Sequence, residues 1–149
     1  MKDKLLLISL LLFGLSLTQT AVYFTGYKQA TSYSSIAMLL TGAIGLVGGG
    51  ILEWLIWLAN PIYLYALICL TRNKINKALF ISLIALAIAL SFRLWHTILV
   101  SENGRVAPIS SFGTGYYLWL ASIATLFIGA AYLASRLAMP AQSNPPRSL

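Results

Sequence analysis

The chain has 149 residues, of which 59% are hydrophobic and 9% are charged, and its mean hydropathy is +0.83. These values lie outside the range of soluble domains and predict an integral membrane protein. In a soluble protein the formal charge of +7 would suggest a nucleic-acid partner. Here the basic residues cluster beside apolar runs, where they act as topology signals and contact anionic lipids. The composition therefore predicts a lipid bilayer as partner and no nucleic acid.

Four apolar segments are long enough to cross a hydrocarbon layer of ~30 Å as helices. They are residues 5–24, 52–71, 78–99 and 116–135. The first has the character of a signal sequence, but a cut after Ala21 would place Gln19 at the −3 position, which favours an uncleaved signal anchor. Residues 1–138 are then one membrane domain, and the proline-rich residues 139–149 are predicted to be a disordered cytoplasmic tail.

Residues 36–50 are apolar but would form a helix of only about 22 Å, which is too short to cross. Three successive glycines at 48–50 allow the chain to reverse. A crossing here would put Arg72, Lys74 and Lys77 outside, against the positive-inside rule. We therefore expect a plasma-membrane protein with both termini cytoplasmic. The fold class predicted is an all-α membrane protein with four transmembrane helices and a short Gly-rich re-entrant or interfacial segment between helices 1 and 2.

Helix packing and one kink can also be predicted. Pro61 cannot donate a hydrogen bond to the carbonyl of Trp57, so the second span should kink there, with Asn60 available to satisfy the freed group. A helix that begins at Pro61 with Asn60 as its cap is the alternative, but it leaves too few residues to cross before Arg72.

Small residues at helical spacing predict close helix contacts. These candidate packing residues are Gly45, Gly49, Ala85, Ala89, Thr125 and Gly129.

Aromatic residues gather near the expected outer ends of the second, third and fourth spans. Amphipathic rings prefer the level of the lipid headgroups, so this pattern predicts an anchoring belt. Its members are Trp54, Trp57, Trp95, Tyr116, Tyr117 and Trp119.

Residues with catalytic chemistry are scarce. One His, one Cys and three acidic residues cannot assemble a catalytic triad, a carboxylate pair or a metal cluster within one copy, so we expect no enzyme activity, no cofactor and no metal. The candidate polar site is Glu53 with Arg93 and His96, since these residues fall at similar depth near the outer interface. An ion pair between Glu53 and one of the two is feasible, as a structural link between spans or as a functional site.

Two short segments, Trp57-Leu-Ala-Asn-Pro-Ile-Tyr-Leu-Tyr-Ala66 and Gly113-Thr-Gly-Tyr-Tyr-Leu-Trp-Leu-Ala-Ser122, resemble parts of small, uncharacterised bacterial inner-membrane proteins. The resemblance implies a bacterial cytoplasmic membrane and carries no function. The small multidrug exporters are similar in size and helix number, but their essential Glu lies in the first span. Residues 5–24 of this chain contain no carboxylate.

Two functions remain open at this stage. The first is a non-enzymatic membrane protein that acts through helix packing, as an accessory subunit of a membrane-protein partner or as a homo-oligomer. The alternative is a small transporter or lipid-handling protein with its polar site at Glu53, Arg93 and His96. The packing faces favour the first function, and the Gly-rich segment beside Glu53 favours the second.

Overall fold

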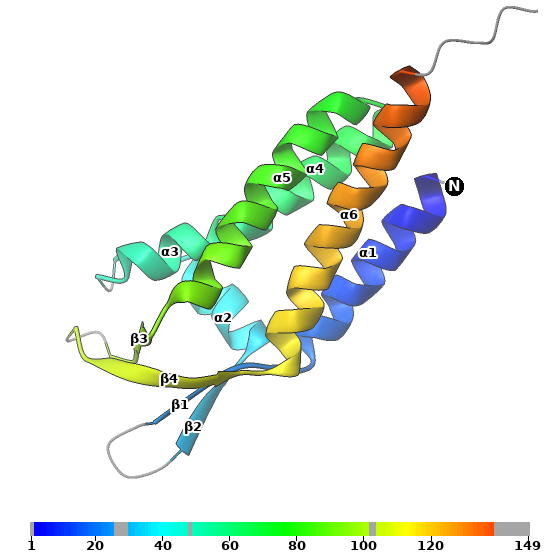
Figure 1. Cartoon of the computed structure of the whole chain (residues 1–149). Helices are drawn as coiled ribbons and strands as arrows, with labels where there is room; N and C mark the ends of the chain where they lie inside the picture. The colour runs from blue at the N-terminus through cyan, green and yellow to red at the C-terminus, as the bar shows by residue number, and fades with distance from the viewer. Residues whose placement is uncertain (1, 26–29, 48, 102–103, 139–149) are drawn as a thin grey trace, which may run out of the picture.

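The computed structural model describes residues 2–25, 30–47, 49–101 and 104–138. Long helices form a bundle, and four strands lie at one end of it (Figure 1). The N-terminus, the turn between α4 and α5 and the end of α6 all lie at the opposite end. Lys2 connects the N-terminus to the turn between α4 and α5, since its Nζ donates a hydrogen bond to Asn73 Oδ1 at 2.6 Å. The predicted disordered tail, residues 139–149, lies outside the described residues.

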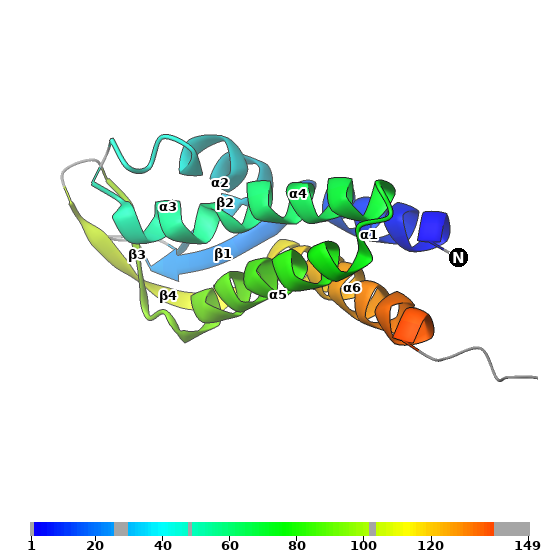
Figure 2. The same cartoon turned by 90° about the horizontal axis from the view of Figure 1, so that it is seen from above.

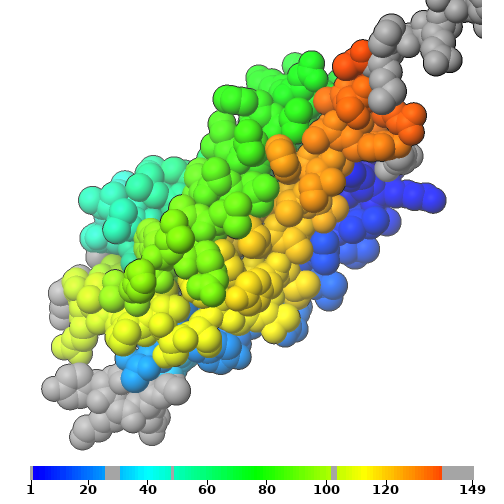
Figure 3. Space-filling view, in the orientation of Figure 1, coloured from blue at the N-terminus to red at the C-terminus, as the bar shows by residue number. Residues whose placement is uncertain are grey.

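The bundle consists of α1 (Lys2–Leu17), α4 (Ala59–Thr71), α5 (Ile75–Ser91) and α6 (Thr114–Ala138), with the short α3 (Ile51–Trp57) leading into α4. Figure 2 shows α4 beside α5, and Figure 3 shows α5, α6 and α1 side by side on one face. Three helical stretches in the described chain have the length and composition to cross a membrane. These are Ile51–Thr71, Ile75–Leu94 and Thr114–Ala138.

The sheet is antiparallel, with strand order β2-β1-β4-β3. Two strands follow α1, namely β1 (Thr20–Thr25) and β2 (Ala30–Ser34), and two follow the short 3-10 helix η1 (Phe92–Leu94), namely β3 (Thr97–Leu99) and β4 (Val106–Phe112). The pairing of β1 with β4 therefore joins two connections that are far apart in the sequence. A second hydrophobic core forms where the sheet meets the bundle, around Val22, Phe24, Ile98, Phe92 and Tyr116.

The predicted all-α fold with four transmembrane helices is wrong, because the structure is mixed α/β and has three candidate spans. The error lies in the segment 5–24, where helix α1 ends at Leu17 and the chain continues as β1. In β1 the buried Val22 and Phe24 alternate with the exposed Tyr23. This period of two, with β-branched and aromatic residues, is typical of a strand with one buried face. The segment 78–99 also ends as a strand, β3.

The described part of residues 36–50 does not form a helix of spanning length. Residues 36–42 belong to α2 (Ser35–Gly42), whose N-cap Ser34 accepts a hydrogen bond from the N–H of Ala37, and turns follow at residues 43–47. Gly49 has a φ of +82°, a conformation that glycine adopts without the steric cost of a Cβ. The reversal between α2 and α3 therefore depends on a glycine.

The small residues of α5 and α6 pack inside the chain. Ala85 and Ala89 are completely buried within the bundle. A Cβ at Gly129 of α6 would collide with the side chain of Leu5 on α1, so the absence of a side chain permits the close approach of these two helices. The helix faces that the sequence suggested for docking are thus largely covered by the chain's own helices.

Gly113 sets the junction between the sheet and the bundle. Its N–H donates a hydrogen bond to Ala21 O at 2.8 Å, and a Cβ at this position would collide with the carbonyl oxygen of Thr20. We expect Gly113→Ala to lower the melting temperature of the purified protein, because backbone cannot move aside as a flexible side chain can. Intrinsic tryptophan fluorescence during heating in detergent measures this effect.

The matched control is Gly14→Ala on α1, where a Cβ would meet no atom within 4 Å. This substitution should leave the melting temperature unchanged or raise it slightly, since Ala is favoured over Gly in helices by about 0.5–1 kcal/mol. Equal behaviour of the two variants would contradict the assigned junction.

Candidate functional site

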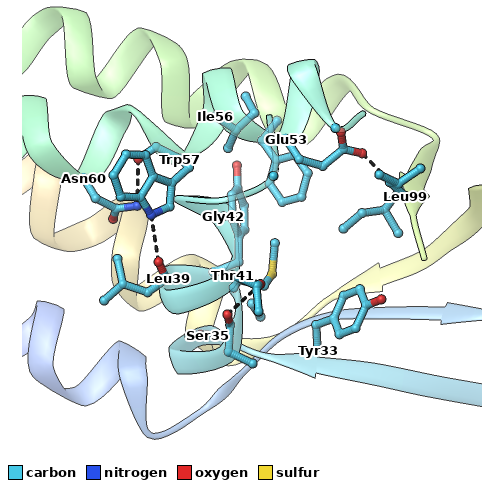
Figure 4. A pocket seen from close by; sticks show the side chains of 18 of the residues that line it. Tyr33, Ser35, Leu39, Thr41, Gly42, Glu53, Ile56, Trp57, Asn60 and Leu99 are labelled. Atoms are coloured by element: carbon cyan, nitrogen blue, oxygen red, sulfur yellow. Dashed lines mark hydrogen bonds between the residues drawn. The ribbon is translucent and has the colours of Figure 1, made fainter. Parts of the chain in front are cut away.

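A cavity of about 960 Å³ lies between the bundle and the sheet. Its walls come from α2, the turns that follow it, α3, the start of α4, β3 and the first turns of α6. Figure 4 shows side chains from β2, α2, α3, α4 and β3 around the open space. The volume is at the upper end of the range for small-molecule sites, about 300–1,000 Å³, and the lining is mainly apolar with a few polar groups.

One helical face provides the wall formed by α3 and α4. Glu53, Ile56, Trp57 and Asn60 line the cavity and follow the spacing i, i+3, i+4, i+7, which places them on one side of a helix. The sequence contains this pattern, and the presence of Glu and Asn in an otherwise apolar stripe was a signal that could have identified the wall.

Asn60 connects two walls of the cavity. Its Nδ2 donates to the carbonyl of Trp57 at 2.9 Å, the group that Pro61 leaves without its usual backbone donor. Its Oδ1 accepts a hydrogen bond from Trp119 Nε1 at 2.9 Å, which joins α4 to α6. The neighbouring Trp57 donates its Nε1 to Leu39 O of α2 at 2.7 Å. These three bonds hold α2, α3, α4 and α6 around the cavity, and Figure 4 shows the two that involve Trp57.

The three residues of the predicted polar site are not brought together around the cavity. Glu53 lines it, and its Oε1 accepts a hydrogen bond from the N–H of Leu99 in β3 at 2.9 Å. Arg93 and His96 are exposed and are not among the lining residues. The guanidinium of Arg93 instead lies 5.0 Å from the ring centroid of Phe112. The partner of Glu53 in this structure is thus the backbone of a strand that the sequence analysis did not foresee.

Several aromatic residues expected in a lipid-anchoring belt turn inward. Trp57, Tyr116 and Trp119 line the cavity, whereas Tyr117 is exposed. Tyr116 is almost fully buried and donates its hydroxyl to Ala89 O at 3.1 Å. The position of aromatics near helix ends gave no indication of which face would be covered by a sheet.

Two lining residues were missed entirely, Ser35 and Tyr33. Ser35 is 9% exposed, and its Oγ is buried with no hydrogen-bond partner among the described residues. Buried polar atoms are nearly always paired, so an unpaired hydroxyl in a cavity wall indicates a place for a bound water or ligand. Burial raises the pKa of the Tyr33 phenol above its usual value, so its ring remains neutral at physiological pH.

Few side chains that could hold a metal or provide a nucleophile are found among the described residues of the site. Among the described residues, no group of three or more His, Cys, Asp or Glu side chains is placed to hold a metal ion. In the part of the chain that the structure describes, the lining contains one carboxylate and no histidine or cysteine that would provide a base or nucleophile beside it. Comparison with known proteins adds no function, because no family model, no curated protein and no solved structure matches this chain.

We expect Asn60→Leu to destabilise the protein. The substitution leaves Trp57 O and Trp119 Nε1 without partners, at a cost of about 1–3 kcal/mol for each buried group. Thermal unfolding of the purified variant measures the loss. Trp119→Phe should cost less in the Asn60→Leu background than in the wild type, because its hydrogen-bond partner is already gone.

The exposed Asn76 on α5 offers a control of the same residue type. Asn76→Leu should change the melting temperature little, since surface substitutions usually stay within about 0.5 kcal/mol. Strict additivity of Asn60→Leu and Trp119→Phe would contradict the proposed link between α4 and α6.

Proposed function

We propose that this chain is a non-enzymatic membrane protein that takes up an apolar or amphipathic molecule from the lipid bilayer and holds it in the cavity between bundle and sheet. The observation that carries this proposal is the large, mainly apolar cavity with one unpaired buried hydroxyl in its wall. The proposed activity is the lipid handling expected from the sequence. Its site is Glu53 and the cavity around it, in place of Glu53, Arg93 and His96.

Exposed apolar side chains support a membrane location. The outer faces of the bundle helices carry Leu11, Leu64, Phe80 and Ile128, with exposures between 44% and 64%. Such a continuous apolar surface is expected to contact lipid or another protein. Basic residues gather at the end of the bundle away from the sheet, as the bond between Lys2 and Asn73 and the position of Arg72 and Lys74 in the α4–α5 turn illustrate. By the positive-inside rule this end is cytoplasmic.

The cavity wall made by α2 and the following turns offers a route for entry. Leu40 and Leu46 are 69% and 48% exposed and do not line the cavity, whereas Ile44 and Val47 line it, so the segment carries apolar side chains both outside the cavity and toward it. A segment that is apolar on both sides is compatible with lipid outside and an apolar ligand inside. In the proposed orientation it lies near the outer headgroup level, and a molecule can enter from the outer leaflet.

An accessory subunit or homo-oligomer, the first function considered from the sequence, has weaker support. Its basis was the set of small-residue faces, and Ala85, Ala89 and Gly129 are used within the chain. The outer helix faces carry mostly large apolar side chains, which suit lipid as well as protein.

Photo-crosslinking tests the proposal. In proteoliposomes that contain a lipid with a photoreactive group on its tail, we expect label on peptides from α2, α3 and β3, in addition to the lipid-facing side of α5. Ala37→Trp places a large ring at the cavity wall and should reduce the label on α3 and β3 several-fold, while label on α5 stays constant. Mass spectrometry of the digested protein locates the labelled residues.

Ala43→Trp is the matched control, because Ala43 follows α2, is exposed and does not line the cavity. It should leave the labelling pattern unchanged. Label confined to the outer faces of the helices, with no response to Ala37→Trp, would overturn the proposed function.

Cysteine accessibility tests the orientation independently. In a Cys69→Ala background, Ser32→Cys in β2 should react with an impermeant reagent added outside intact cells, and Asn76→Cys at the start of α5 should react only after the membrane is opened. Both positions are exposed and lie at opposite ends of the molecule. Labelling of both from the same side would contradict the proposed orientation.

A further inference from the structure

We infer that the cavity selects a single-chain amphiphile with a cationic head group, whose amine or quaternary ammonium pairs with Glu53 while its chain occupies the apolar interior. This inference rests on the proposed function and specifies its ligand. It depends on the charge of the lining, the acceptor positions that the Glu53 carboxylate has left for a ligand, and the aromatic surface nearby.

The lining carries charge of one sign. Glu53 is the only carboxylic acid among the described residues that line the cavity, and no Lys, Arg or His is among them. An anionic head group, such as a fatty-acid carboxylate or a phosphate, would place like charges together in apolar surroundings without a counter-ion. A cationic head group places opposite charges together, and a charge-assisted hydrogen bond is about twice as strong as a neutral one.

The carboxylate retains room for a ligand. Oε1 is used by the N–H of Leu99, but an ionised carboxylate has about four acceptor positions over its two oxygens. Oε2 lies beside Gly50, where a Cβ would stand 3.2 Å from it, so a glycine at this position avoids a close contact with this oxygen. The bond from Leu99 fixes the direction of the carboxylate, which reduces the entropy lost when a cation binds.

Aromatic surface faces the same end of the cavity. Figure 4 shows Tyr33 across the open space from Glu53. A neutral phenol ring attracts a cation through its face, and this attraction suits ammonium groups that carry alkyl substituents. Glu53 and Tyr33 thus line the same cavity from α3 and β2.

The rest of the cavity suits an alkyl chain. Asn60 lies seven residues after Glu53 on the same helical face, or about 10 Å along the helix axis. Between these two polar residues the wall consists of Ile56 and the ring of Trp57, and Phe92 and Ile98 come from other elements. The volume matches a drug-sized molecule with one chain. We therefore place the head at Glu53 and the chain toward Asn60.

The test uses three amphiphiles of the same chain length with bromine at the chain end, namely an alkyl trimethylammonium, a primary alcohol and a carboxylate. Bromine quenches tryptophan on contact, so a chain in the cavity is detected at Trp57 and Trp119 in a Trp54→Phe, Trp95→Phe background. Concentrations are expressed per lipid after the partitioning of each amphiphile into protein-free vesicles has been measured. We expect the ammonium compound to quench at a concentration about tenfold lower than the carboxylate.

Glu53→Gln keeps an acceptor for Leu99 and removes the charge. It should weaken quenching by the ammonium compound about tenfold and leave quenching by the alcohol unchanged. Asp3→Asn removes a carboxylate at the far end of the bundle and should alter neither the quenching by the ammonium compound nor the quenching by the alcohol. Equal quenching by the ammonium and carboxylate compounds, or an ammonium response unaffected by Glu53→Gln, would overturn the head-group assignment. Absence of quenching by all three compounds, the alcohol included, would overturn the proposed function as well.

Discussion

The two hydrogen bonds of the Asn60 side-chain amide are the interactions on which the cavity depends. Pro61 removes one backbone hydrogen bond from the helix, and Asn60 replaces it with its own Nδ2 while its Oδ1 binds the indole of Trp119. In an apolar environment an unpaired carbonyl is costly, so the same residue that repairs the helix also fixes its distance from α6. Trp57, on the same face, extends the link to α2.

The sheet imposes the second constraint. Buried backbone at the end of the bundle must form its hydrogen bonds within the protein or with water, and pairing β1 with β4 does so between connections that are far apart in sequence. Gly113 permits the close approach that joins this sheet to α6. With the sheet fixed to the bundle on one side and α2 held by Trp57 on the other, the space between them stays open.

The three candidate spans follow from apolar runs in the sequence, because an apolar run of spanning length acts locally. The sheet was not predicted, since Thr20–Thr25 continues the apolar run of α1. Only the alternation of buried and exposed residues distinguishes this strand from the helix. The partner of Glu53 could not be foreseen for the same reason. A carboxylate and an arginine expected at the same depth suggest an ion pair. The actual partner of Glu53 is the N–H of Leu99, which reaches it only when β3 has formed.

A structure determined in a lipid nanodisc made with the lipids of the native membrane tests the central claim most directly, namely that the cavity holds a molecule from the bilayer. The account predicts elongated non-protein density between Trp57 and Tyr116, with Asn60 bonded to Trp119 as described. A structure in which α2 and α3 close onto the sheet, with their side chains filling the space and no density between them, would contradict it.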